Sequence, residues 1–246
     1  MNKLKERVMT GTFFAVALVS ILAAVLICVF LVLGGFPSIK EIGIKNFLLG
    51  KEWRPSEGIY GVFPMIIGSI YVTLGALIIG VPIGILTAIF LSRFCPKILY
   101  KFLKPAVTLL AGIPSVVYGL FGLTVIVPFI RDYIGGRGMS LLAASLLLGL
   151  MILPTIVSVS QTALRAVPDS YYEGSLALGA THEESVFKTV LPAAKSGIFA
   201  GIVLGLGRAI GETMAVMMVA GNQPIFPESI TDGVRTLTTN IVLEMG

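Results

Sequence analysis

Five long apolar runs, separated by charged segments, constrain the fold of this chain more than any other feature. They cover about residues 12–33, 60–91, 105–130, 140–162 and 196–220. Each run is close to or above the ~20 residues that an α-helix needs to cross the hydrocarbon core of a bilayer. Inside a membrane the backbone can satisfy its hydrogen bonds only in helices or closed barrels. The sequence therefore predicts an all-α, polytopic membrane helical bundle.

The composition favours a membrane protein over a soluble one. Hydrophobic residues make up 56% of the 246 positions, charged residues make up 13%, and the mean hydropathy is +0.96. The net charge of +5 does not indicate nucleic-acid binding, because the basic residues are scattered at the ends of apolar runs. We expect one integral-membrane domain over residues 1–246, in contact with the lipid bilayer and with no nucleic-acid partner.

The distribution of basic residues predicts the orientation of the chain. Ten Lys and Arg lie on the side that holds the N-terminus, seven lie on the other side, and one lies within the membrane. Because an excess of positive charge marks the cytoplasmic side, we expect a cytoplasmic N-terminus. A cleaved signal peptide is the alternative for the first run. The run is longer than the usual ~7–15 residue core, so we expect a multi-pass protein anchored in the cell membrane.

The last apolar run carries two charges in its interior, Arg208 and Glu212. A charge at the centre of a membrane helix costs roughly 2.5–3.5 kcal/mol on insertion scales, so it must face protein, water or an ion. On one continuous helix both charges share a face with small residues, which directs that face toward the bundle interior. These small residues are Gly197, Gly201, Gly205 and Ala215.

Two interpretations of Arg208 and Glu212 stay open. They form an internal ion pair that fixes helix packing, or Arg208 binds an anion on a permeation route. We favour the second interpretation, because Arg before Glu is the less favourable order for an i,i+4 pair in a helix. The planar guanidinium can also hold an oxyanion through two parallel hydrogen bonds.

Residues 164–195 form a loop with helix signals of its own. Ser170-x-x-Glu173 and Thr181-x-x-Glu184 are capping-box patterns, and Gly179 lies between them. They predict two short helices joined by a turn at Gly179, the second limited by Pro192. His182 is expected to be a solvated helix residue. The apolar side chains of the loop either pack on the protein's own bundle or form a docking site for another subunit: Tyr171, Tyr172, Leu176, Val186 and Phe187.

The sequence holds none of the patterns typical of an enzyme. It has no phosphate-binding loop G-x-x-x-x-G-K-[ST], no G-x-S-x-G elbow, no clustered metal ligands and a single histidine. Cys28 in mid-run and Cys95 in a basic loop do not indicate a disulfide or a metal site. We expect no catalytic residue, no metal and no cofactor, and we expect ATP hydrolysis to occur in a separate subunit.

The loop resembles the EAA motif of ABC importer permeases, E-A-A-x3-G-x9-I-x-L-P. Glu173, Gly179 and Leu191-Pro192 match this motif at its spacing, whereas Gly174-Ser175 and Thr189 depart from it. Further segments between about residues 60 and 240, above all GLGRAIGETMAVMMVAGN, are similar to PstC-type permeases of phosphate importers.

The resemblance implies a type I ABC importer permease fold, MetI-like, with a core at about residues 60–246. Such permeases have six helices, so the usual sixth is expected to follow Gly246. The implied partners are a second homologous permease subunit, two cytosolic ATPase subunits and an extracytoplasmic phosphate-binding protein. The resemblance assigns coupling to the ATPase to four loop residues, Glu173, Gly179, Leu191 and Pro192. It places Arg208 and Glu212 on the substrate pathway.

The implied function is import of inorganic phosphate, and alternatives remain open. They are a permease for another oxyanion, a membrane scaffold that relays phosphate status to a sensor kinase, and an ion-coupled secondary transporter. The loop 164–195 disfavours the last of these. Phosphate near neutral pH has a proton to donate to Glu212 and sulfate does not, so Glu212 is expected to select against sulfate.

Overall fold

The computed structural model describes residues 3–245, which fall into two compact units that meet at Phe63 and Pro64. The N-terminal unit begins with α1 (Lys3–Ile42), a 40-residue helix whose span-forming part buries no side chain within the chain. At 1.5 Å per residue α1 is about 60 Å long, which exceeds the thickness of a bilayer core.

A small structured segment completes the N-terminal unit. It contains α2 (Ile44–Leu49) and an antiparallel hairpin of β1 (Trp53–Arg54) and β2 (Ile59–Tyr60). Trp53 pairs with Tyr60 across the hairpin, and their rings meet edge to face at a centroid distance of 5.7 Å. Gly58, with φ +74°, closes the turn, because this conformation favours glycine.

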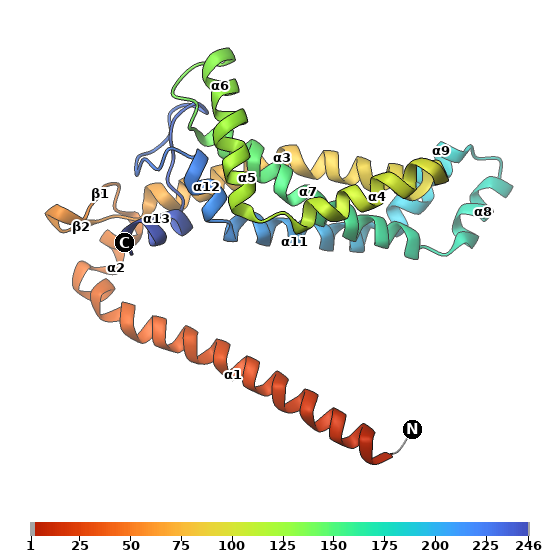
Figure 1. Cartoon of the computed structure of the whole chain (residues 1–246), viewed down its shortest axis with the longest axis horizontal. Helices are drawn as coiled ribbons and strands as arrows, with labels where there is room; N and C mark the ends of the chain where they lie inside the picture. The colour runs from red at the N-terminus through yellow and green to blue at the C-terminus, as the bar shows by residue number, and fades with distance from the viewer. Residues whose placement is uncertain (1–2, 246) are drawn as a thin grey trace. The chain divides into compact units, whose positions relative to one another are not determined.

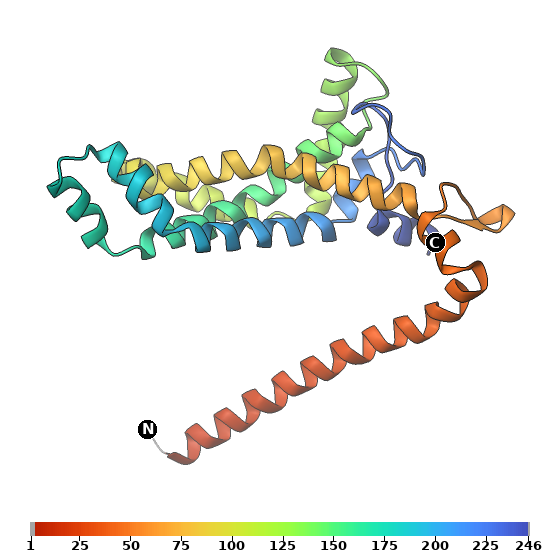
Figure 2. The ribbon, with the colours of Figure 1, turned by 180° about the vertical axis from the view of Figure 1, so that it is seen from behind.

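The C-terminal unit is a bundle in which α3, α4, α7 and α11 run alongside one another (Figures 1 and 2). The loop with α8 and α9 lies at one end of these helices, and α12 and α13 lie at the other end (Figure 1). The helices of this unit are α3 (Phe63–Ile89), α4 (Lys97–Gly112), α5 (Ser115–Phe121), α6 (Val127–Tyr133), α7 (Leu141–Ala166), α8 (Asp169–Ala177), α9 (His182–Ser185), α10 (Leu191–Ala193), α11 (Lys195–Gly211), α12 (Met214–Val219) and α13 (Leu237–Glu244).

Glycines allow α3 and α11 to approach α7 closely. A Cβ atom added at Gly80 would lie 2.8 Å from Ile152, and one added at Gly205 would lie 2.9 Å from Ile156. Gly84 meets Ile156 in the same way. The four-residue spacing of small residues thus serves helix packing, as predicted. Among the candidate spans α7 is the most enclosed, with 61% of its apolar window buried.

Helices long and apolar enough to cross a membrane account for most of the predicted spans. Four single helices of the described chain satisfy this test, and a fifth candidate is a pair of helices bent by 68°, His182–Ala193 with Lys195–Gly211. The four are Lys5–Ile42, Phe63–Phe94, Ser115–Tyr133 and Leu141–Ala166. The chain is therefore a multi-pass helical membrane protein.

The run at 105–130, predicted as one span, is divided in the structure. α4 ends at Gly112, and the chain is extended at Ile113 before Pro114. Pro114 has no N–H to continue the helix, and it disfavours the helical conformation at Ile113. The crossing segment instead begins at Ser115 and runs to Tyr133, through a π-helical turn at Gly122–Ile126.

Candidate functional site

Arg208 lies in the last turn of α11, half-buried, about 20 Å along the helix axis from Lys195. Its Nη1 donates a hydrogen bond to Thr155 Oγ1 of α7 at 3.4 Å. Within residues 3–245 no carboxylate lies within ion-pair distance of this guanidinium. The internal ion pair between Arg208 and Glu212, which was the first of the two interpretations of these charges, is therefore not formed.

Glu212 does not continue the helix that carries Arg208, so the single helix predicted over 196–220 is wrong. α11 ends at Gly211, and Glu212 is extended with ψ 131°. The Glu212 carboxylate accepts a hydrogen bond from the Ala215 N–H at 3.2 Å, in the first turn of α12. A carboxylate at a helix N-terminus satisfies a free N–H and complements the helix dipole, which stabilises the break.

The segment after α12 folds back toward this break. The Thr238 hydroxyl donates to the Glu212 carbonyl at 3.0 Å, and the Ser69 hydroxyl accepts the N–H of Leu237 at 2.9 Å. Thr236 and Thr239 form a reciprocal cap at the start of α13. The N-terminus of α13 is thereby held between α3 and the end of α11.

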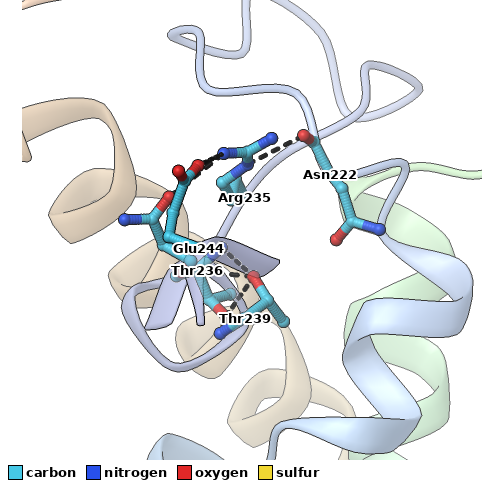
Figure 3. Close-up of polar contacts among 6 residues, drawn as sticks. Asn222, Arg235, Thr236, Thr239 and Glu244 are labelled. Atoms are coloured by element: carbon cyan, nitrogen blue, oxygen red, sulfur yellow. Dashed lines mark hydrogen bonds and ion pairs between the residues drawn. The ribbon is translucent and has the colours of Figure 1, made fainter. Parts of the chain in front are cut away.

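Arg235 fixes this returning segment (Figure 3). Its Nε donates to the Asn222 carbonyl at 2.9 Å, and its Nη1 lies 3.1 Å from both Asn240 Oδ1 and Glu244 Oε1. The Arg235 side chain is 16% exposed, so it is well shielded from solvent. Sequence reasoning missed this cluster because its partners are 5 to 13 residues apart and follow no helical or strand period. The one sequence signal in this region was the Thr-x-x-Thr pattern at 236–239, which indicates the start of a helix at α13.

The loop 164–195 forms two short helical segments around Gly179, as predicted. Gly179 has φ +90°, a conformation that favours glycine. The capping box of Thr181 and Glu184 is present, and Lys188 donates to Glu184 at 2.8 Å. This hydrogen bond, with that from the Thr181 N–H, holds the pKa of Glu184 below its ordinary value. The capping box predicted at Ser170 is wrong, because α8 already begins after Pro168 and Ser170 lies inside its first turn.

The residues assigned to coupling differ in exposure. Glu173, Gly179 and Pro192 are exposed, whereas Leu191 packs against a core cluster of the bundle. Tyr172 and Val186 also face that cluster. The outward apolar surface of the loop consists of Tyr171, Leu176, Leu178 and Phe187, of which Leu178 is 92% exposed. Packing on the protein's own bundle is thus confirmed for Tyr172 and Val186. Docking of another subunit on the exposed face stays a prediction.

Arg93, at the end of α3, ties the loop to the bundle. It forms an ion pair with Asp169 at 3.3 Å, donates to the Leu164 carbonyl at 3.3 Å and lies over the Tyr172 ring at 5.7 Å. The Tyr172 hydroxyl and His182 Nδ1 are 2.7 Å apart. His182 is half-buried and also meets the ring of Phe94, so it is more enclosed than the sequence suggested.

Pro96 creates a second link between α3 and α7. The π-helical turn Phe90–Phe94 ends with the Cys95 N–H bonded to the Phe90 carbonyl. The Leu91 carbonyl would next need an N–H at position 96, which proline lacks. It instead lies within 3.5 Å of Gln161 Nε2 and 3.4 Å of Arg165 Nη2.

The same buried Gln161 holds α4. Lys104 Nζ donates to Gln161 Oε1 at 2.8 Å, and Gln161 Nε2 lies 3.4 Å from the Tyr100 hydroxyl. Gln161 is 2% exposed, so these bonds satisfy an amide that would otherwise be costly to bury. These hydrogen bonds thus link α4 and the end of α3 to α7 near the start of the loop.

The structure places the two groups of candidate residues at separate positions of the C-terminal unit. Arg208 and Glu212 lie at the end of α11, next to α12, whereas the coupling candidates lie on the loop that precedes α11. The loop helices α8 and α9 lie at one end of α11 and α12 lies at the other (Figure 1). No group of three or more His, Cys, Asp or Glu in the described residues could hold a metal ion. Fold and sites together define a membrane permease with a helical loop at one end of α11 and a charged group at the other.

The comparisons with known proteins assign this permease to a family. The model of binding-protein-dependent transport system inner membrane components matches residues 80–242. The chain belongs to this family.

Relatives in this family include two bacterial proteins with extensive similarity. The probable ABC transporter permease protein YqgH of Bacillus subtilis is 46% identical over 237 residues, covering 94% of this chain and 77% of that protein. The phosphate transport system permease protein PstC of Pasteurella multocida is 36% identical over 255 residues, covering 96% and 79%. The resemblance to PstC-type permeases is therefore confirmed.

Solved structures show the same fold. One inward-facing form of the MetNI methionine ABC transporter matches with a TM-score of 0.52 at 23% identity, covering 79% of this chain and 90% of that chain. A second form matches with a TM-score of 0.51 at 22% identity, covering 75% and 85%. The predicted MetI-like fold of type I importer permeases is confirmed. The roles of individual residues stay predictions.

Proposed function

We propose that this chain is a membrane permease subunit of an ATP-driven importer that moves inorganic phosphate into the cytoplasm. The observation that carries the proposal is the environment of Arg208. Its guanidinium has five N–H donors, one neutral partner in Thr155 and no carboxylate, so it retains donors for an anion. The names of the PstC relatives support phosphate as that anion.

The proposed partners are those of a complete importer. A second homologous permease subunit would complete the route, two cytosolic ATPase subunits would hydrolyse ATP, and an extracytoplasmic phosphate-binding protein would deliver the substrate. The N-terminus and the loop 164–195 would then be cytoplasmic, and the surface of Tyr171, Leu176, Leu178 and Phe187 would contact an ATPase subunit.

The loop and Arg208 would be coupled through α11. The segment His182–Ala193 meets α11 at a bend of 68°, so a displacement of the loop would be transmitted along a helix. Because Arg208 lies about 20 Å along that helix, a small rotation at the bend shifts the guanidinium relative to neighbouring helices. Glu173, Gly179, Leu191 and Pro192 would receive the motion from the ATPase, and alternating access would follow from it.

Uptake of radiolabelled phosphate by proteoliposomes that contain all partner subunits tests this function. We expect uptake that requires this chain, ATP and the binding protein. Uptake without this chain would contradict the proposal and favour a scaffold that relays phosphate status to a sensor kinase. Uptake of another oxyanion in preference to phosphate would support the permease function and would contradict phosphate as its substrate.

A further inference from the structure

Thr155 differs from four other helical threonines of the bundle in what its hydroxyl does. In these four the hydroxyl donates to the carbonyl four residues earlier in its own helix, at 2.7–3.0 Å: Thr87, Thr108, Thr124 and Thr162. The Thr155 hydroxyl forms no such bond within the described residues. It accepts the Arg208 Nη1–H instead.

The hydrogen-bonding capacity of this hydroxyl is therefore incompletely used. A threonine hydroxyl has one donor hydrogen and two acceptor lone pairs. Arg208 occupies one lone pair, and the donor hydrogen has no partner in the described chain. In a low-dielectric region a polar hydrogen without a partner is costly, so a partner from outside the chain is favoured.

Close packing of α11 on α7 fixes the positions of Thr155 and Arg208. Gly205 lies one helical turn before Arg208 and packs against Ile156, the neighbour of Thr155. Two rigid helices thus hold a guanidinium and a hydroxyl side by side. Both residues are half-buried, so the pair is accessible from one side.

We propose that Thr155 is a second ligand of the transported oxyanion, donating its hydroxyl hydrogen to an anion oxygen while its lone pair accepts the Arg208 N–H. The inference rests on the proposed function, since it adds a binding group to the anion site at Arg208. A hydroxyl adds a directional bond without adding charge. It thereby contributes recognition while leaving the anion free to dissociate, which a transport site requires.

Three variants in the full importer complex test the inference. Thr155→Val keeps the shape of the side chain and removes the hydroxyl, Thr155→Ser restores the hydroxyl, and Thr162→Val removes a hydroxyl that bonds only to its own helix. Radiolabelled phosphate uptake and ATP hydrolysis are measured together at saturating loaded binding protein. Their ratio reports a loss of substrate handling that a general folding defect would not produce.

We expect Thr155→Val to lower the phosphate carried per ATP by roughly tenfold or more, because one hydrogen bond to a charged ligand is lost. Thr155→Ser and Thr162→Val should keep the wild-type ratio. A wild-type ratio in Thr155→Val would overturn the inference. If Thr155→Val fails to assemble, Thr155→Ala takes its place in the same comparison.

Arg208→Lys separates the two proposals. Loss of uptake in Arg208→Lys, together with a wild-type ratio in Thr155→Val, would overturn the role of Thr155 alone. Wild-type uptake in Arg208→Lys would overturn the anion site at Arg208, and the role of Thr155 with it, while leaving phosphate import itself in place. Failure of the proposed function would instead appear as phosphate uptake that does not require this chain.

Discussion

Arg208 is held by one neutral side chain, and this determines how its substitution should behave. The contact with Thr155 is a single 3.4 Å hydrogen bond, so the fold depends little on the guanidinium. An anion ligand, in contrast, would use the planar fork of donors, which a lysine ammonium does not reproduce.

Arg208→Lys should abolish phosphate uptake and leave assembly intact. The positive charge remains, but bidentate binding of an oxyanion is lost. Uptake by proteoliposomes and the yield of the purified complex measure the two effects. Arg131→Lys is the matched control, because Arg131 is exposed and pairs with the adjacent Asp132. Wild-type uptake by the Arg208 variant would remove this residue from the substrate pathway.

Glu212→Gln should raise sulfate uptake relative to phosphate uptake. The Gln amide retains an oxygen that can accept the Ala215 N–H, so the cap of α12 persists while the negative charge is removed. Competition between labelled phosphate and sulfate measures the ratio. An unchanged ratio would restrict Glu212 to its helix-capping role.

The helices show where sequence reasoning works and where it stops. Apolar runs and glycine spacing predicted most of the spans and the close packing at Gly205, because hydropathy and helical periodicity are local properties. The break at Glu212 was missed because it depends on a side chain capturing a backbone N–H three residues later. The run 105–130 was predicted as one span, and the end of α4 before Pro114 was missed. A proline in a membrane helix produces either a kink or an end, and the sequence alone does not distinguish the two.

Long-range contacts explain the remaining misses. The bonds of Leu91 to Gln161 and of Arg93 to Asp169 join residues 70 and 76 positions apart. Neither pair follows a period that a single sequence reveals. The same holds for Thr155 and Arg208, 53 positions apart, so sequence reasoning singled out Arg208 without its hydrogen-bond partner.

Gly205→Ala should destabilise the bundle by about 1–3 kcal/mol through overpacking. The added methyl would lie 2.9 Å from Ile156 Cγ1 and would force α11 away from α7. Gly207→Ala is the matched control in the same helix, because no atom lies within 4 Å of its added Cβ. Thermal unfolding of the purified complex should separate the two, with Gly207→Ala neutral or slightly more stable. Equal stability of both variants would contradict the packing of α11 on α7.

Thr181→Ala should lower the free energy of local unfolding of α9 by about 0.5–2 kcal/mol, because the helix loses its N-terminal cap. Hydrogen exchange of residues 182–190 measures the change.

In the wild type the lowered pKa of Glu184 preserves the cap from neutral pH down through the ordinary carboxyl range. Protection should fall as the pH drops below the ordinary carboxyl range and through the lowered pKa, because protonation then removes the negative charge that strengthens the bonds from Lys188 and the Thr181 N–H. Loss of protection already near neutral pH would contradict this assignment.

At the scale of the whole molecule, α11 joins the two regions that hold the candidate functional residues. The loop that carries Glu173 and Gly179 precedes α11, and the break at Glu212 follows it. The links of Arg93 and Gln161 connect the loop to α3, α4 and α7, so the C-terminal unit has a continuous path of contacts from loop to bundle.

The account depends on Arg208 facing an aqueous route during transport. Cysteine labelling tests this directly, with Arg208→Cys placed in a background in which Cys28 and Cys95 are replaced by serine. In the assembled importer we predict reaction with a charged, membrane-impermeant thiol reagent during ATP turnover. A cysteine at position 208 that stays unreactive in every state of the cycle would contradict the account.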